Sequence, residues 1–261
     1  MVSGWDSGMK KIVRALEHHK PIEDCIADYA SRKPYRKVTQ PNGPPTLEIT
    51  EQPPLDISVL SGEIIYQLRS ALDHFFFDLV QRNGPPLTAK QVHNCFFPLK
   101  TERPLESIGP IGKANLLLDY QRRIPDGAFT LIEGLQPYNR IHHGHTLLRM
   151  LAKFSNIDKH RYLVPTLLKV SRRYTTTSSG GGVQHTTIMP MLDHGAKLYD
   201  EIPNPYPWAK NPMKVEDEYA MVIAFNEPEF GPPETAVIEE LIHSLPTFVF
   251  RIGVELKQFL C

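Results

Sequence analysis

The most constraining pattern in this chain is an apolar repeat between residues 57 and 82. Apolar residues recur there at intervals of three or four, the spacing that places side chains on one face of an α-helix. They are Ile57, Leu60, Ile64, Leu68, Ala71, Phe75 and Leu79. The run Asn83-Gly-Pro-Pro86 would end such a helix, because proline cannot continue one. We therefore expect a long amphipathic helix over 57–82.

Weaker patterns predict the remaining elements. Apolar stripes predict helices over 6–31, 112–122, 127–135, 144–158 and 234–260, with Pro21 expected to bend or split the first and Pro246 to kink or restart the last. In the first helix the expected stripe is Ile12, Val13, Leu16, Ile22, Ile26 and Tyr29. Alternating residues around a proline- and glycine-rich turn predict a hairpin over 35–51.

The second half of the chain changes character. Segments rich in β-branched and aromatic residues predict one antiparallel sheet, with strands over 162–172, 183–189, 196–202 and 219–226. Helices on both sides of a run of strands are typical of the α+β class. We predict a single α+β domain over 1–261, with a helical part at about 1–160 and 234–260 and a β-rich insertion at about 162–227.

The composition disfavours several function classes. Lys+Arg and Asp+Glu number 29 each, so the formal net charge is zero, which argues against broad binding to duplex DNA or anionic membranes. The three cysteines show no C-x-x-C spacing and favour reduced thiols. No segment has the length of a membrane span or a secretory signal, so we predict a cytoplasmic protein with no membrane partner.

Arg69 and His74 are the candidate catalytic residues, and they lie on the expected long helix. Five residues advance about 500° around a helix, so the two side chains diverge by about 140°. Another element, or a second copy of the helix, would have to complete a site. Asp73 is placed to pair with Arg69 at the surface. Asp78, four residues after His74, could orient the imidazole or raise its pKa.

A second polar cluster closes the helix expected over 144–158. Asn156 and His160 share a helical face if the helix extends that far, and they could contact a substrate or the long helix. Basic residues at a helix end also fit the negative end of the helix dipole, so both interpretations remain open. The residues predicted to bind or orient a substrate are Asp73, Asp78, Asn156, Asp158, Lys159, His160 and Arg161.

The sequence predicts no cofactor and no metal. His142, His143 and His145 lie together, but no well-spaced carboxylate or cysteine would complete a zinc site, and we interpret them as an exposed helix start. The glycines at 180–182 lack the lysine of a P-loop, so we interpret them as a hairpin turn. Gly-x-Ser-x-Gly and GxGxxG motifs are absent from the sequence, which disfavours common hydrolases and dinucleotide-dependent enzymes.

Two resemblances add to this interpretation. Residues 59–74, 135–138 and 156–161 are similar to segments of a widespread family of uncharacterised bacterial proteins, and the order of elements agrees over most of the chain. Separately, Arg69-x4-His74 resembles the R-x(4–6)-H motif of the HEPN superfamily, whose helical members occur in toxin–antitoxin, abortive-infection and CRISPR systems. Many of them are metal-independent ribonucleases. Active members often carry Asn, Asp or His directly after the arginine, where this chain has Ser70.

The HEPN resemblance implies a HEPN-like helical bundle with a small antiparallel sheet added, and a homodimer that doubles the motif. It also implies RNA as a partner, and an antitoxin or other protein as a second. Histidine titrates near neutral pH and suits proton transfer, and a guanidinium suits phosphate oxygens. The resemblance thus gives His74 the proton-transfer role and Arg69 the phosphate-binding role.

Two alternatives remain open. The first is a non-catalytic interaction or ligand-sensing module that uses Arg69, His74 and Asn156 as structural hydrogen-bonding groups. The second is a small-molecule enzyme that uses the His/Asp/Asn cluster for acid–base chemistry. A buried ion pair between Arg69 and Asp73 or Asp158 would favour the first, whereas a deep enclosed pocket would favour the second.

Overall fold

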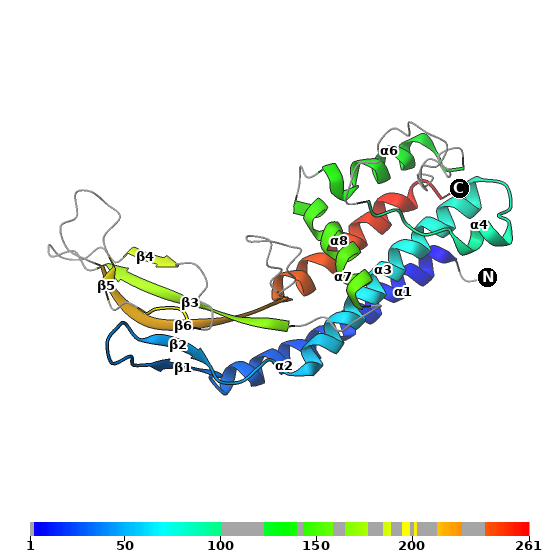
Figure 1. Cartoon of the computed structure of the whole chain (residues 1–261). Coiled ribbons are helices and arrows are strands. Elements are labelled where there is room, and N and C mark those ends of the chain that lie inside the picture. Colours follow the sequence, from blue (N-terminus) through cyan, green and yellow to red (C-terminus); the bar gives the residue numbers. More distant parts are fainter. Residues whose placement is uncertain are drawn as a thin grey trace, which may run out of the picture. The chain divides into compact units, whose positions relative to one another are not determined.

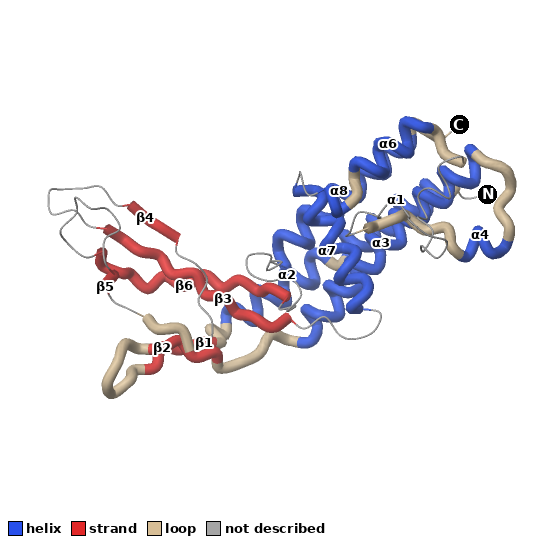
Figure 2. Tube along the Cα trace, turned by 45° about the horizontal axis from the view of Figure 1, so that its top comes forward, coloured by secondary structure: helices blue, strands red, loops and turns tan. Residues whose placement is uncertain are grey.

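The computed structural model describes residues 3–100, 123–139, 143–158, 165–176, 185–188, 195–198, 201–202, 213–225 and 238–260 (Figure 1). The chain divides into two compact units, each assembled from separate stretches of the sequence. The first unit contains residues 1–22, 58–163 and 239–261, and the second contains 23–57 and 164–238. All the described strands belong to the second unit, and helices make up most of the first (Figure 2). The α+β class is therefore confirmed.

The expected helix over 6–31 is two helices, α1 (Gly4–Glu17) and α2 (His19–Ser31). The chain breaks at His18 rather than at Pro21, which lies in the first turn of α2, where a missing N–H costs no helical hydrogen bond. Val13 and Leu16, expected in the apolar stripe, are 54% and 46% exposed, so this part of the prediction was wrong. Ile12 of the predicted stripe is buried in α1, together with the small residues Gly8 and Ala15.

The long helix is α3 (Leu55–Asn83), and it ends where the Gly-Pro-Pro run begins, as expected. Every residue of its predicted stripe is buried except the partly exposed Leu60. Ile65, Leu72, Phe76 and Val80 are buried as well, so the helix is covered around much more than one narrow face.

α8 (Ile238–Lys257) runs without interruption past Pro246. Gly8 of α1 and Gly253 of α8 both lie against the ring of Phe75, which makes α3 the centre of the first unit.

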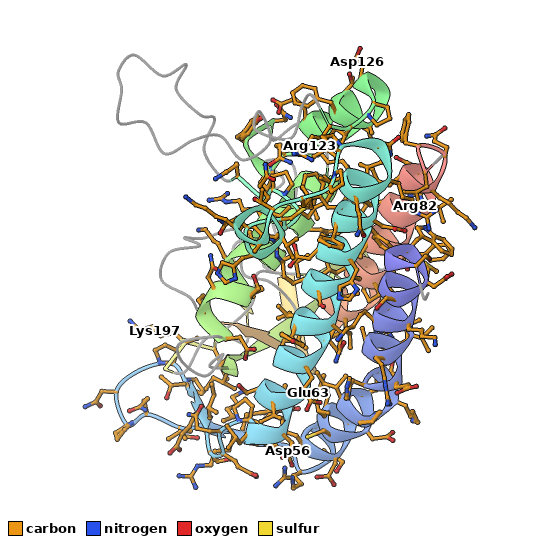
Figure 3. All side chains as sticks on the ribbon, turned by 90° about the vertical axis from the view of Figure 1, so that its right-hand side faces the viewer. Asp56, Glu63, Arg82, Arg123, Asp126 and Lys197 are labelled. Atoms are coloured by element: carbon orange, nitrogen blue, oxygen red, sulfur yellow. The ribbon has the colours of Figure 1, made fainter. Side chains whose placement is uncertain are left out.

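The remaining helices of this unit are α4 (Ala89–His93), α6 (Asp126–Gly134), the 3-10 turn η1 (Pro137–Asn139) and α7 (His143–Asp158). The helices expected over 127–135 and 144–158 are confirmed, whereas the one expected over 112–122 lies outside the described residues. Arg123, just before α6 (Figure 3), donates a hydrogen bond to the carbonyl of Pro85 at 2.7 Å. This contact ties the start of α6 to the loop that follows α3.

The second unit holds the predicted hairpin, β1 (Tyr35–Val38) paired with β2 (Thr46–Ile49). It also holds a four-stranded antiparallel sheet in the order β4-β3-β6-β5. These strands are β3 (Pro165–Thr176), β4 (His185–Ile188), β5 (Glu201–Ile202) and β6 (Met213–Phe225). The β-rich insertion expected at about 162–227 lies within this unit, which takes in the hairpin as well. The glycine-rich turn at 178–182 lies outside the described residues.

Backbone hydrogen bonds join β2 to residues 195–198, so the hairpin gains a third extended segment from the later part of the chain. Among the helices that the structure describes, not one combines the length and the apolar character needed to cross a membrane.

Candidate functional site

Arg69 is held by groups from two segments of the first unit. Its Nη2 atom donates a hydrogen bond to the backbone oxygen of Phe97 at 2.7 Å and lies 3.0 Å from Oδ1 of Asp73. The same carboxylate oxygen accepts the backbone N–H of Phe97 at 2.9 Å. The expected Arg69–Asp73 pair is therefore confirmed, but it is not a surface pair, because the arginine side chain is only 16% exposed. Together the two side chains bind both backbone polar groups of one residue.

Residues 95–100, here called the strap, are neither helix nor strand. Gln136, which is 1% exposed, holds the strap at two later residues. Its side-chain nitrogen donates to the carbonyl of Pro98 at 3.0 Å, and its side-chain oxygen accepts the N–H of Lys100 at 3.0 Å. The ring of Phe97 is fully buried and meets Phe76 edge to face, with 6.1 Å between ring centres.

The strap explains why polar side chains are buried at this place. Backbone N–H and C=O groups that leave water need partners, and a segment outside helices and sheets cannot obtain them from a regular ladder. Arg69, Asp73 and Gln136 supply those partners. Their immediate role is structural, since they make burial of Phe97 compatible with satisfied backbone hydrogen bonds.

One edge of the Arg69 guanidinium is not used in this way. Nη1 is buried and has no hydrogen-bond partner. Burial lowers the pKa of Arg69, and the neighbouring Asp73 acts in the opposite direction. Arginine stays charged in proteins at neutral pH, so this edge presents a buried, charged donor. An unpaired buried donor lowers the stability of the folded protein by about 1–3 kcal/mol. An acceptor placed at Nη1 would therefore stabilise the protein.

His74, the second candidate catalytic residue, lies five residues after Arg69 on α3. Burial lowers the pKa of the half-buried His74, Lys11 of α1 lowers it further, and Asp73 acts in the opposite direction. The imidazole is therefore neutral at pH 7. Arg69 binds the strap, and Lys11 of α1 acts electrostatically on His74, in keeping with the divergence that the helical spacing predicted. Asp73 acts on both residues, as the ion-pair partner of Arg69 and as a charge that opposes the lowering of the His74 pKa.

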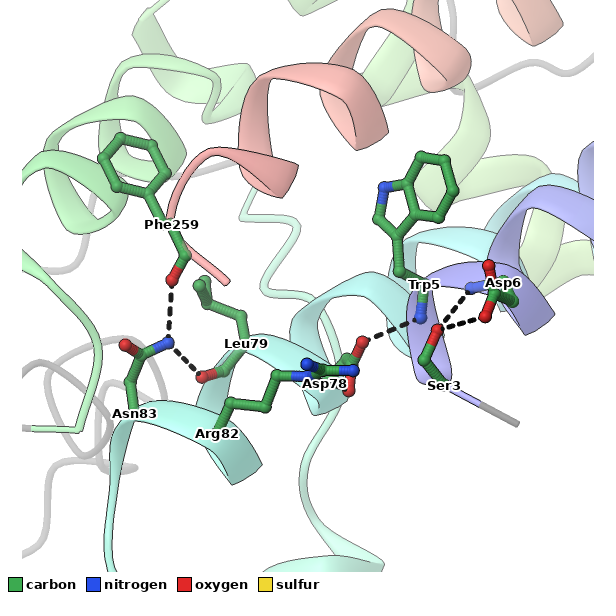
Figure 4. A network of polar contacts seen from close by, with 8 residues as sticks. All are labelled: Ser3, Trp5, Asp6, Asp78, Leu79, Arg82, Asn83 and Phe259. Atoms are coloured by element: carbon green, nitrogen blue, oxygen red, sulfur yellow. Dashed lines mark hydrogen bonds and ion pairs between the residues drawn. The ribbon is translucent and has the colours of Figure 1, made fainter. Parts of the chain in front are cut away.

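Asp78 does not serve His74, and the expectation that it orients the imidazole or raises its pKa was wrong. Its Oδ2 atom accepts the backbone N–H of Trp5 at 2.9 Å, and its Oδ1 atom accepts from Nε of Arg82 at 2.9 Å (Figure 4). Asp78 is buried, and it caps the start of α1 together with Ser3, whose hydroxyl accepts the N–H of Asp6. The helix N-terminus is the competing partner that sequence reasoning did not foresee.

The cluster at the end of α7 reaches the long helix through Asp158. A Cβ atom added to Gly62 would lie 2.4 Å from Oδ1 of Asp158, so the carboxylate rests directly on α3. Although the residue as a whole is exposed, this contact removes water from its carboxyl group, and desolvation raises the pKa of Asp158. Asn156 is exposed. Lys159, His160 and Arg161 lie outside the described residues.

Of the three segments quoted for the bacterial-family resemblance, two contact each other in the first unit, and the third is linked to the first through the strap. Residues 59–74 contact residues 156–161 through Gly62 and Asp158, and the strap joins Arg69 and Asp73 to Gln136 in 135–138. Sequence reasoning missed the strap and the role of Gln136. The available signals were a glutamine directly before Pro137 and, elsewhere in the sequence, the short apolar patch at 95–98.

No group of three or more metal-ligating side chains occurs among the described residues, and the side chains of His142, His143 and His145 lie outside them. Fold and site together define an α+β protein whose helical unit is centred on a helix carrying Arg69, Asp73 and His74. Comparison of the chain with protein-family models, curated proteins and solved structures gave no significant match.

Proposed function

We propose that this protein is a non-catalytic interaction or ligand-sensing module built on a HEPN-like helical bundle. The observation that carries the proposal is the engagement of Arg69 by the backbone of Phe97 and by Asp73. A guanidinium held in this way stabilises a buried segment, and removing it would leave Asp73 and the Phe97 carbonyl without their partner. The R-x4-H motif then serves the fold, not a reaction.

Three further observations support this proposal. Arg69 and His74 diverge around α3, and Arg69 is already bound by Phe97 and Asp73, so one chain does not direct both at a common reacting group. The residue that follows the arginine is Ser70, where active HEPN enzymes often carry Asn, Asp or His. Asp78 is likewise occupied by the start of α1, which removes a carboxylate from acid–base chemistry.

A metal-independent ribonuclease-like or RNA-binding activity is the second candidate, and the state of His74 favours it. Because the pKa of His74 is lowered, its imidazole is neutral at pH 7 and able to take a proton from a ribose 2′-hydroxyl. A homodimer of HEPN type would bring His74 of one copy near Arg69 of the other. The two residues could then form one site although they point in different directions on a single helix. In this candidate the unpaired Nη1 of Arg69 would bind a phosphate oxygen.

Cleavage of single-stranded RNA by the purified full chain, with EDTA present, separates the two candidates. The variants are His74→Ala and the control His243→Ala, which removes an exposed histidine of α8. For a non-catalytic module we expect no cleavage by the wild-type protein or by either variant. Cleavage that His74→Ala abolishes and His243→Ala retains would overturn the proposal and support the ribonuclease, provided that circular dichroism shows both variants folded. Growth arrest on overexpression, relieved by His74→Ala, would point the same way.

A further inference from the structure

Four exposed apolar side chains of the first unit lie on two of its helices, α1 and α8. Val13 and Leu16 of α1 are 54% and 46% exposed, and Phe250 and Val254 of α8 are 42% and 47% exposed. Within each pair the spacing is three or four residues, so the two members share one face of their helix. Single exposed apolar residues are ordinary on a protein surface, whereas a contiguous group marks an interaction site. The position of α1 relative to α8 decides whether the two pairs form such a group.

α1 and α8 lie side by side and run in opposite directions (Figure 3). At the start of α1, Nε1 of Trp5 donates a hydrogen bond to the carbonyl of Gly253 at 3.1 Å, and Nζ of Lys257 lies 4.0 Å from the centre of the Trp5 ring. Just after the end of α1, the ring of His19 meets that of His243, with 5.7 Å between ring centres. The start of α1 therefore lies beside the end of α8, and its end lies beside the start of α8.

These contacts also show which way the exposed apolar residues face. His243 and Lys257 contact the α1 side, and Phe250 is seven residues from each, about two helical turns, so it lies on the same side of α8. Leu16 is eleven residues after Trp5, about three turns, so it lies on the side of α1 that borders α8. The two pairs thus adjoin along the junction of the helices and form one apolar surface, here called the stripe: Val13, Leu16, Phe250 and Val254.

Charged residues border the stripe along α1. Lys10 and Glu17 are both exposed, and they lie three residues before and four residues after Val13. A second copy of α1, packed antiparallel with Val13 against Val13, would bring each lysine beside the glutamate of the other copy. Glu17 already pairs with Arg14, but that pair is exposed and stabilises the chain little, so it leaves Glu17 able to exchange partners. The charge pattern is therefore complementary to itself, as the interface of a two-fold dimer must be.

We propose that the stripe is covered by the stripe of a second copy of this chain, in a two-fold dimer whose α1 helices are antiparallel. α1 has 14 residues, so the stripe extends about 20 Å along two adjacent helices and offers roughly 400 Å², about half of what each partner buries in a standard interface. The dimer is therefore weak, with a dissociation constant in the micromolar range or above.

This dimer goes beyond the function proposed above and does not depend on the role of Arg69. Phe75 of α3 lies against the buried faces of α1 and α8, at Gly8 and Gly253. The stripe is on their exposed faces, so these two helices of each copy separate one α3 from the other. Unlike a dimer of HEPN type, the arrangement does not bring His74 of one copy near Arg69 of the other.

Sedimentation velocity of the full chain over a range of micromolar concentrations tests the proposal, and we expect a reversible monomer–dimer equilibrium. Val254→Asp should weaken the association by about tenfold or more, because each copy would bring an unpaired carboxylate into the apolar interface. Val92→Asp is the matched control, since Val92 lies on α4 and has the same 47% exposure as Val254. This variant should dimerise like the wild type, and circular dichroism shows whether both variants are folded.

Exchanging the border charges distinguishes an antiparallel second copy from any other occupant of the stripe. Lys10→Glu should weaken the dimer about fivefold, because two ion pairs become two contacts between like charges. Adding Glu17→Lys should restore the association, because the charges are then complementary again. Both positions are exposed, so neither substitution should unfold the chain.

Three results would overturn the inference. A chain that stays monomeric at every concentration would mean that a different partner, or solvent, covers the stripe. A dimer that Val254→Asp does not weaken would place the interface on another face. A Lys10→Glu dimer that Glu17→Lys does not restore would contradict the antiparallel pairing of the α1 helices.

Discussion

The carboxylate of Asp78 accepts the backbone N–H of Trp5 with 2.9 Å between oxygen and nitrogen, and so joins α3 to the start of α1 across 73 residues of sequence. The first N–H groups of a helix have no partner within the helix, and a carboxylate there satisfies one of them and complements the helix dipole. Arg82 binds the other oxygen of Asp78. Each of these contacts depends on the same buried side chain.

Replacing Asp78 with alanine should lower the free energy of unfolding by about 2–3 kcal/mol, because a buried N–H loses its acceptor and α1 loses a cap. Urea unfolding followed by circular dichroism measures the change. Asp6→Ala provides the control, since Asp6 lies in the first turn of the same helix but is exposed. Equal losses for the two substitutions would show that Asp78 acts only through the charge near the helix end.

The close packing of α1 and α8 against Phe75 gives a second prediction. A Cβ atom at Gly8 would lie 2.4 Å from the Phe75 ring, and one at Gly253 would lie 2.6 Å from it. Phe75 is 1% exposed and has little room to move. We expect Gly8→Ala and Gly253→Ala each to destabilise the protein by about 1–3 kcal/mol, although alanine favours helix more than glycine does.

Gly134→Ala is the matched control for these substitutions. Gly134 is the last residue of α6 in the same unit, and a Cβ atom there would meet no atom within 4 Å. The thermal unfolding midpoint of the Gly134→Ala variant should stay at or slightly above that of the wild type. A stability gain at Gly8 or Gly253 similar to that at Gly134 would contradict the close approach of the three helices.

The elements that the sequence predicted well are those with local signals. α3 ends at Asn83 because the Gly-Pro-Pro run that follows cannot continue a helix, and this holds wherever the helix packs. The buried face of α1 was predicted less well, because Val13 and Leu16 are exposed while Gly8 is buried. A glycine gains a buried position only where a neighbouring helix approaches closely, and that neighbour is not encoded in the local pattern.

In the candidate site too, the contact between residues close in sequence was predicted, and the contact with a distant segment was not. The Arg69–Asp73 pair follows from a spacing of four residues on a helix and was predicted. Phe97, which both side chains bind, lies 28 residues after Arg69, and no periodic pattern connects them. α4 was missed although Thr88 and Gln91 form a capping box, because a helix of five residues leaves no apolar periodicity to detect.

Burial of Phe97 gives a third prediction, with its control in the adjacent residue. Phe97 is fully buried, whereas Phe96 is 38% exposed. Phe97→Ala should lower the free energy of unfolding by about 3–5 kcal/mol, because it leaves a cavity beside Phe76. Phe96→Ala removes the same atoms from a partly exposed position and should cost far less. Similar urea midpoints for the two variants would show that the strap is not packed as described.

The lowered pKa of His74 gives a prediction about pH. Because its pKa in the folded protein is below the ordinary 6.5, the unfolded chain binds more protons once the pH falls below that value. Stability is therefore fully present above pH 6.5 and is lost as the pH falls towards the folded-state pKa. His74→Gln removes this contribution, so the stability of the wild type relative to the variant should rise with pH between 5 and 7.5.

An NMR titration of the His74 imidazole measures the shift directly. Lys11→Met should move the midpoint upward by part of the total shift, because burial is the larger cause and Lys11 the second. A wild-type midpoint at or above 6.5 would contradict the prediction, and it would also remove the argument that His74 is neutral at pH 7.

A double-mutant cycle on Arg69 and Asp73 tests whether the pair acts as one unit with the strap. Arg69→Met should cost about 3 kcal/mol, because it leaves a carboxylate without its cation and the Phe97 carbonyl without a donor. Adding Asp73→Ala removes the uncompensated charge, so the double variant should be more stable than the sum of the two single losses predicts, by about 1–2 kcal/mol.

The exposed pair Arg14–Glu17, with side chains 69% and 52% exposed, is the control cycle and should give a coupling of about 0.3–0.5 kcal/mol. Equal coupling in the two cycles would mean that Arg69 behaves as an ordinary surface arginine, and the assignment of its guanidinium to the strap would then fail.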